Sequence, residues 1–311
     1  MQSGEKPDTR RKLKLIKKQK ITLLETGLRD GLQAVKNYVS IKDRILLTNG
    51  LIDAGIKSIQ ITSFVNPKKV PQMSESEELI QSLNFEKNVE YSALVFNLRG
   101  VERAINSGIG KIETSISVSE NYNQKNLGLN NKQAIERLKE VTQFAIRNKL
   151  KVRAGLQCVW GTSSDRNIQL NEILRKISFI LEQGVNKISL CDTSGFARPD
   201  TVARLLELVY NKFPKINLCL HFHNTYGNGL KNLSCALQFG ITEIDTSLGG
   251  IGGTPYLKNS KGNIATEDTV LLLKDMGYET GIDYKLVSEQ SKFLEKIIGS
   301  EYFSSSVYKT N

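Results

Sequence analysis

The sequence predicts a closed (β/α)8 barrel, the TIM-barrel fold, with one extra C-terminal helix. Eight short β-rich segments alternate with helical patterns along the whole chain. The stretch between successive segments is long enough for a loop, a helix and a return, as parallel strands require. A length of 311 residues suits a single barrel of this kind. A doubly wound open sheet is the alternative, but eight evenly spaced units favour closure.

The predicted strands are short β-rich runs separated by polar segments. They cover residues 21–27, 58–64, 89–96, 111–118, 151–159, 187–192, 217–223 and 243–248. Apolar residues at helical spacing predict the helices between them. The clearest stripes are Ala134, Leu138, Val141, Ala145 and Val202, Leu205, Leu206, Val209. The other predicted helices cover 40–54, 74–83, 98–107, 170–183, 226–239 and 264–276, and the extra helix covers 283–298.

The composition indicates one globular domain behind a basic tail. Hydrophobic residues make up 39% of the chain, which is normal for a soluble domain. No window approaches 18 apolar residues and the N-terminus has no apolar secretory core, so neither a membrane span nor a signal peptide is expected. The net charge is +11, and residues 1–20 hold eight Lys or Arg against two acids. We therefore expect a tail over 1–20 and a barrel domain over 21–311.

The tail and the cysteines bear on partners and location. A basic tail can bind nucleic acid or an anionic membrane, but solubilisation is the simpler interpretation, so neither partner is expected. The features of a mitochondrial transit peptide are weak. The four cysteines are spread out with no paired motif, which favours free thiols in a reducing compartment. Cytoplasm is the expected location.

Two histidines provide the first functional signal. His221 and His223 are the only histidines in the chain, and both fall in the seventh predicted strand. Side chains at i and i+2 of a strand share a face, so two imidazoles can point together into the barrel. Asp30 follows the first strand, whose end lies near that of the seventh in a closed barrel. Two histidines and a carboxylate also describe a non-haem iron triad, but no other feature indicates oxygen chemistry, and Mg²⁺ or Mn²⁺ fits equally.

Two further strand ends carry candidate functional groups. The segment 249–263 follows the last predicted strand and contains five glycines, among them Gly252 and Gly253. Such a loop can close over a ligand or bring backbone N–H groups to a phosphate, although it lacks the spacing of a Walker or dinucleotide motif. Asp192 follows the sixth strand. It is interpreted as a base, as an orienting group or as the cap of the next helix.

Several segments together resemble the 3-hydroxy-3-methylglutaryl-CoA (HMG-CoA) lyase family. They are ETGLRDGLQ, TSFVNPKKVPQM, FNLRG, CDTSG, HFHNTYGNGL and GGIGGTPYLKNSKGNIATED. The resemblance as a whole runs from about residue 20 to about residue 300. The family belongs to a superfamily of metal-dependent carbon–carbon lyases and synthases. The resemblance implies a TIM barrel, a divalent ion (Mg²⁺ or Mn²⁺), an acyl-CoA substrate and a homodimer. The implied reaction is a retro-Claisen cleavage that yields acetyl-CoA and a keto acid.

The resemblance also assigns roles to individual residues. The implied metal ligands are Asp30, His221, His223 and Asn263. Arg29 would polarise a carbonyl and stabilise the enolate, because a fixed cation there opposes the developing negative charge. Asp192 matches an acid of the family site. The implied substrate-binding positions are Asn97, Ser119, Gly252 and Gly253.

Two catalytic positions depart from the family pattern. Thr254 stands where the family loop has its catalytic cysteine, and an alcohol is a much weaker acid than a thiol. Gln60 stands where the family has a glutamate. Because losing a positioned acid costs ~10²–10⁴ in rate, we expect metal binding to persist and HMG-CoA cleavage to be weak or absent. Two alternatives stay open: a condensing or aldol-type enzyme of the same superfamily acting on another acyl-CoA or α-keto acid, and a non-catalytic metal- or ligand-binding barrel.

Overall fold

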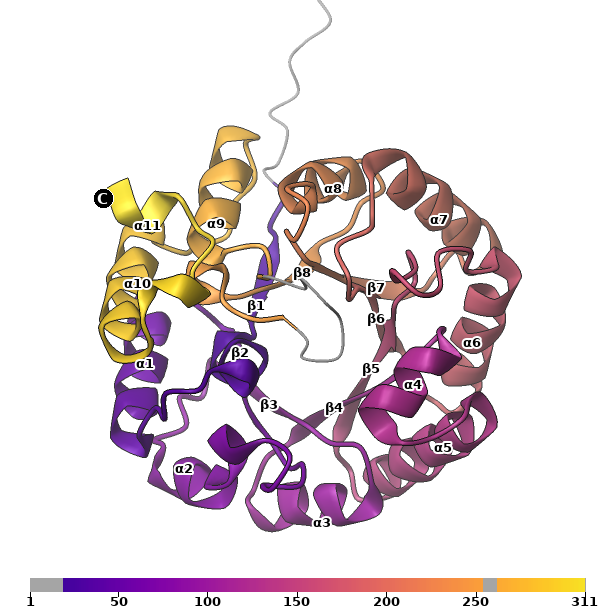
Figure 1. The fold of residues 1–311 in the computed structure, drawn as a ribbon, viewed down its shortest axis with the longest axis horizontal. Helices are drawn as coiled ribbons and strands as arrows, with labels where there is room; N and C mark the ends of the chain where they lie inside the picture. Colours follow the sequence, from indigo (N-terminus) through magenta and orange to yellow (C-terminus); the bar gives the residue numbers. More distant parts are fainter. Residues whose placement is uncertain (1–18, 254–261, 311) are drawn as a thin grey trace, which may run out of the picture.

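The structure, a computed structural model, describes residues 19–253 and 262–310 and has the predicted closed barrel. Its eight parallel strands pair in chain order, and β1 pairs with β8 to close the ring (Figure 1). The strands are β1 (Thr22–Glu25), β2 (Ser58–Ser63), β3 (Glu90–Leu94), β4 (Lys111–Ser117), β5 (Lys151–Gln157), β6 (Lys187–Asp192), β7 (Asn217–Phe222) and β8 (Glu243–Thr246). Each lies within its predicted range. The alternative of an open sheet is wrong, because the register runs from Thr22↔Glu243 to Glu25↔Thr246.

Helices form the outer layer around the barrel (Figure 1). They are α1 (Ile41–Asp53), α2 (Ser76–Ser82), α3 (Leu98–Asn106), α4 (Glu120–Leu127), α5 (Asn131–Arg147), α6 (Leu170–Glu182), α7 (Pro199–Lys212), α8 (Gly229–Leu237), α9 (Thr266–Asp275), α10 (Tyr284–Ile298) and α11 (Val307–Thr310). The predicted extra helix is α10. The sequence pattern missed α4, since its residues are mostly polar, and the four-residue α11. Local signals define α4: the Ser119 hydroxyl accepts the Tyr122 N–H, and Gly128 ends the helix at a φ of 71°.

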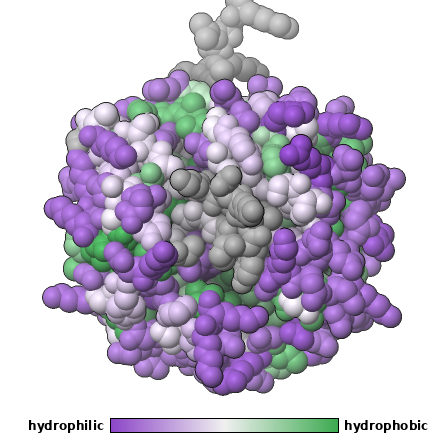
Figure 2. All heavy atoms as spheres, in the orientation of Figure 1, coloured by the Kyte–Doolittle hydropathy of each residue, from purple (hydrophilic) through white to green (hydrophobic). Residues whose placement is uncertain are grey.

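The apolar core lies between the strands and the helices. All four residues of the α7 stripe, Val202, Leu205, Leu206 and Val209, are buried against it. Full burial of one such side chain contributes about 1.5–3 kcal/mol, so a helix with four of them is firmly attached. The face seen in Figure 2 is predominantly hydrophilic, and apolar side chains occur on it only in separate patches.

Three further expectations concern the N-terminal tail, the cysteines and a membrane span. Most of the tail over 1–20 lies outside the described residues, although Gln19 and Lys20 pair with Glu279. The tail and domain boundaries therefore stay predictions. All four cysteines are free thiols. Within 19–253 and 262–310, no helix has the length and apolar character needed to cross a membrane.

Candidate active site

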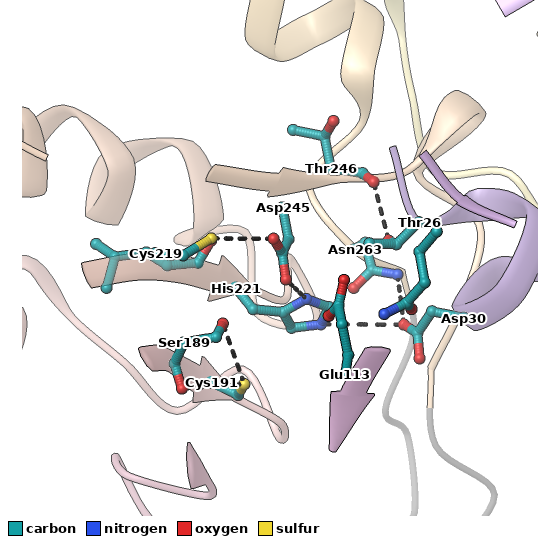
Figure 3. Close-up of polar contacts among 12 residues, drawn as sticks. Thr26, Asp30, Glu113, Ser189, Cys191, Cys219, His221, Asp245, Thr246 and Asn263 are labelled. Carbon is teal, nitrogen blue, oxygen red and sulfur yellow. Dashed lines mark hydrogen bonds and ion pairs between the residues drawn. The ribbon is translucent and has the colours of Figure 1, made fainter. Parts of the chain in front are cut away.

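The three residues first predicted as metal ligands meet at the C-terminal ends of the strands. Asp30 lies in η1 (Gly27–Gly31), a short turn after β1, while His221 lies in β7 and His223 follows it directly. One ligand atom from each residue lies within 4.8 Å of the other two. The Nε2 atoms of the two imidazoles are 3.2 Å apart, which confirms that they share a face. Figure 3 shows His221 between Asp245 and Asp30.

Glycines allow the turns after β1 and β8 to interlock. A Cβ atom on Gly27 would lie 2.2 Å from Leu248, and one on Gly31 would lie 2.5 Å from Ile251. Real Cβ contacts are not that short, so the Leu248 and Ile251 side chains would have to shift if these glycines were replaced. The buried Glu25 carboxylate accepts the N–H of Gly27 at 2.7 Å and that of Leu248 at 3.0 Å. The position of Asp30 therefore depends on the chain that follows β8.

The fourth implied ligand lies beside the first. Asn263 forms an isolated bridge with His223, and its Nδ2 donates to Asp30 Oδ2 at 2.9 Å and to the Ile251 carbonyl at 3.1 Å. Its buried Oδ1 has no hydrogen-bond partner among the described residues. An unpaired buried amide oxygen is costly, and a cation would satisfy it. A carboxylate, an amide oxygen and two imidazoles together suit Mg²⁺ or Mn²⁺.

The protonation states of two of these groups also fit a cation. Burial lowers the pKa of His223 to about 3, so its imidazole is neutral at neutral pH, as a metal ligand must be. Burial opposes ionisation of Asp30, but the neighbouring cation of Arg29 is the largest opposing cause, and the pKa of Asp30 stays below its usual value.

A buried ion-pair network contacts His221 at Nδ1, the ring nitrogen that does not face His223. Its Nδ1 lies 3.2 Å from Asp245 Oδ2, and both carboxylate oxygens of Asp245 accept from Arg153, at 2.6 and 3.0 Å. Arg153 also donates to Glu113 through Nε at 2.8 Å. Burial opposes the charge on Asp245, but Arg153 keeps its pKa below the usual value. A carboxylate on the far nitrogen of a liganding histidine fixes the tautomer and the ring orientation.

Sequence reasoning missed this network of Glu113, Arg153 and Asp245. Charged residues in the middle of β4, β5 and β8 were the available signal, since strands covered by helices on one side and filled on the other are normally apolar. Ion pairing between these residues was not visible, because Arg153 and Asp245 are 92 positions apart.

Arg29 is oriented by two neighbours. Its Nη1 lies 2.6 Å from Asp30 Oδ1, and its Nε donates to Gln60 Oε1. Gln60 is fully buried, and its Nε2 has no partner in the described parts of the chain. The amide therefore orients the guanidinium, while the two N–H groups on its own Nε2 stay unpaired within the described residues.

A cavity of about 390 Å³ opens beside this cluster. Among the predicted site residues, its lining includes Arg29, Asp30, Asn97, His221, His223 and Gly253. Three cations that the sequence did not single out, Lys69, Arg137 and Arg153, also line it. The side chain of Asn97 caps α3 by accepting the Gly100 N–H at 2.8 Å.

The remaining predicted residues lie behind the lining or outside the described chain. Ser119 caps α4, and Gly252 packs so closely on Asn263 that a Cβ atom would lie 2.4 Å from its Nδ2. Asp192 is fully buried; its Oδ1 accepts the Ala197 N–H, and its Oδ2 has no partner among the described residues. Burial raises the pKa of Asp192 to about 7. Thr254 lies outside the described residues.

This fold and cluster define a (β/α)8-barrel protein with a candidate divalent-metal centre. Comparison with known proteins shows which family of such barrels the chain belongs to. The HMGL-like family model matches residues 20–294. The hydroxymethylglutaryl-CoA lyase YngG of Bacillus subtilis is 37% identical over 281 residues, which cover 90% of this chain and 94% of that protein. The chain belongs to the HMGL-like family, so the resemblance stated from the motifs is confirmed.

Solved structures agree with this assignment. The crystal structure of the Bacillus subtilis HMG-CoA lyase superposes with a TM-score of 0.90 at 36% identity, covering 94% of this chain and 98% of that one. An HMG-CoA lyase from Acinetobacter baumannii, solved with coenzyme A and 3-methylmalate, gives 0.89 at 30% identity, covering 94% and 95%. Neither similarity favours the condensing or the non-catalytic alternative.

Proposed function

We propose that this chain is a divalent-metal-dependent carbon–carbon lyase that cleaves a 3-hydroxy-acyl-CoA of the HMG-CoA type into acetyl-CoA and a keto acid. The observation that carries the proposal is the cluster of Asp30, His221 and His223 beside Arg29 in one cavity. The lyases named above, at 30–37% identity, support the same reaction class. Asp30, His221, His223 and Asn263 would hold Mg²⁺ or Mn²⁺. When bound, the ion supplies Lewis-acid stabilisation of the substrate's oxygen atoms.

The chain's own residues then have distinct tasks. Arg29, held by Gln60 and Asp30, places a fixed positive charge where an enolate oxygen develops. Asn97 and Gly253 contact the substrate at the cavity wall. Ser119 and Gly252 act less directly: Ser119 caps the helix that carries Tyr122, a lining residue, and Gly252 supports Asn263.

The proposed site differs from the family pattern at the proton donor. Thr254 stands in place of the family's acidic thiol, so we propose that HMG-CoA turnover is slower by ~10²–10⁴ than with cysteine at that position. Burial raises the pKa of three described carboxyls, Glu25, Asp192 and Glu267, to about 7, so each can hold a proton close to neutral pH. Of these, Asp192 matches an acid of the family site, and it lies at the end of β6.

Charge supports the proposed acyl-CoA class of substrate. Lys69 and Arg137 line the cavity, and their cations complement the phosphates of a CoA group. We further propose a cytoplasmic homodimer whose basic tail acts in solubility, with no nucleic-acid or membrane partner. Sedimentation of the full chain tests the dimer.

Metal-dependent product release tests the function. Wild type should release acetyl-CoA from HMG-CoA only with Mn²⁺ or Mg²⁺, and Asp30→Asn should abolish the release. Asp53→Asn, an exposed carboxylate on α1, is the matched control and should behave as wild type. Release that persists after chelation, or that survives in Asp30→Asn, would refute the proposal.

A further inference from the structure

A short C-terminal segment contacts the glycine-rich chain next to the candidate metal centre. The segment is Phe303–Ser305, called here the strap, and it lies beyond residue 294, where the match to the family model ends. Figure 1 shows this part of the chain, in yellow, folding back beside α9 and α10. The backbone N–H groups of Ser304 and Ser305 both donate to the Gly249 carbonyl at 3.0 Å. The Ser304 hydroxyl donates to the Gly250 carbonyl at 3.1 Å.

The strap fits closely against three glycines. Gly249 has a φ of 63° and Gly250 one of 67°, both in the left-handed region that favours glycine. A Cβ atom on Gly249 would lie 2.2 Å from the Phe303 ring, and one on Gly262 would lie 2.8 Å from the Ser304 hydroxyl. The strap therefore packs on the chain entering the glycine-rich loop and on the chain leaving it.

The strap is itself fixed to the outer helices. The Ser305 hydroxyl donates to Asp268 of α9. The Phe303 ring packs on Tyr308 with centroids 5.3 Å apart, and the Tyr308 hydroxyl donates to Glu295 of α10 at 2.9 Å. Contacts with α9 and α10 therefore hold the strap in place against residues 249–252, called here the glycine segment.

The glycine segment directly supports two candidate metal ligands. A Cβ atom on Gly252 would lie 2.4 Å from Asn263 Nδ2 and 3.4 Å from Asp30 Oδ2. Asn263 also donates to the Ile251 carbonyl at 3.1 Å. A shift of residues 249–252 would therefore move Asn263 and Asp30 relative to each other.

We propose that Phe303 and Ser304 are positioning residues for the metal centre. They hold residues 249–252 in the conformation that places Asn263 beside Asp30. The inference rests on the proposed metal site and is independent of the substrate. The residues act through the glycine segment, and neither touches the reacting atoms.

Mn²⁺ affinity of the full-length chain tests this role, measured by titration calorimetry and by the electron paramagnetic resonance signal of free Mn²⁺. Ser304→Ala removes one hydroxyl–carbonyl bond and should weaken Mn²⁺ binding roughly threefold to tenfold. Ser304→Thr keeps the hydroxyl and should restore the affinity, which a merely structural role would not require. Ser306→Ala is the control, because Ser306 is exposed and its hydrogen bond to the described residues comes from its backbone N–H.

A second variant tests the contact between the Phe303 ring and Gly249. Phe303→Leu stays apolar but loses the fit against Gly249, so it should also weaken Mn²⁺ binding while its melting transition stays cooperative. If Ser304→Ala and Phe303→Leu bind Mn²⁺ as tightly as wild type, the positioning role is wrong while the proposed metal site stands. If wild type binds no Mn²⁺, the proposed metal site fails and the inference fails with it.

Discussion

Replacing Arg153 with methionine is the sharpest test of the buried network behind His221. Arg153 is 4% exposed and contacts Glu113 and both oxygens of Asp245. The variant keeps most of the side-chain volume but leaves two buried carboxylates without their cation. Removing one partner of a buried ion pair costs roughly 3–5 kcal/mol, so we expect the free energy of unfolding to fall by about that amount at pH 7.

The pH dependence distinguishes this mechanism from loss of packing. In the variant, the buried carboxyl of Asp245 loses the cation that lowers its pKa, so it takes up a proton in the folded state that the unfolded chain does not bind. The loss of stability should therefore be largest at pH 7–8 and smaller at pH 5. Urea unfolding at both pH values measures it. Arg175→Met, which breaks an exposed pair with Glu172, is the control and should cost less than about 1 kcal/mol. A loss below 1 kcal/mol for Arg153→Met, or one equal at both pH values, would refute the reasoning.

Three further predictions concern single residues. Asp245→Asn should weaken Mn²⁺ binding about 10–100-fold by releasing the His221 ring, and calorimetry that finds unchanged affinity would exclude this role. Burial raises the pKa of Asp192 from its ordinary value of 3.8 to about 7 in the folded protein, so its ionisation lowers stability as pH rises through that range. The stability of Asp192→Asn relative to wild type in urea should therefore increase from pH 5 to pH 8, and a decrease would contradict the raised pKa. Gly31→Ala should cost about 1–3 kcal/mol in thermal unfolding, because the new Cβ atom would lie 2.5 Å from Ile251, and a neutral result would show that the two turns are not interlocked.

The barrel was predictable because its signals are local and repeated. Each strand and the helix after it have their own pattern of apolar residues. Few folds are compatible with eight such units in one chain. The HxH pair was equally visible, since the two-residue repeat of a strand fixes which side chains share a face.

Features that depend on long-range contact were not predictable. The pairing of Glu113, Arg153 and Asp245 joins three strands, and the strap joins Ser304 to Gly249, 55 positions earlier in the chain. The polar helix α4 was missed because a capping serine and a terminal glycine define it in place of an apolar stripe. The family resemblance suggested Asn97 and Ser119 as substrate-binding positions, and that role stays a prediction. The structure was needed to show that the side chains of both residues cap helices.

Acetyl-CoA release from HMG-CoA, with and without Mn²⁺, by wild type beside Thr254→Cys tests the central claim most directly. The account predicts metal-dependent release by both proteins, with Thr254→Cys faster by ~10²–10⁴. Equal rates would contradict the proton-donor argument and leave the lyase assignment standing. Absence of metal-dependent release from both folded, Mn²⁺-binding proteins would contradict the claim that this barrel cleaves HMG-CoA.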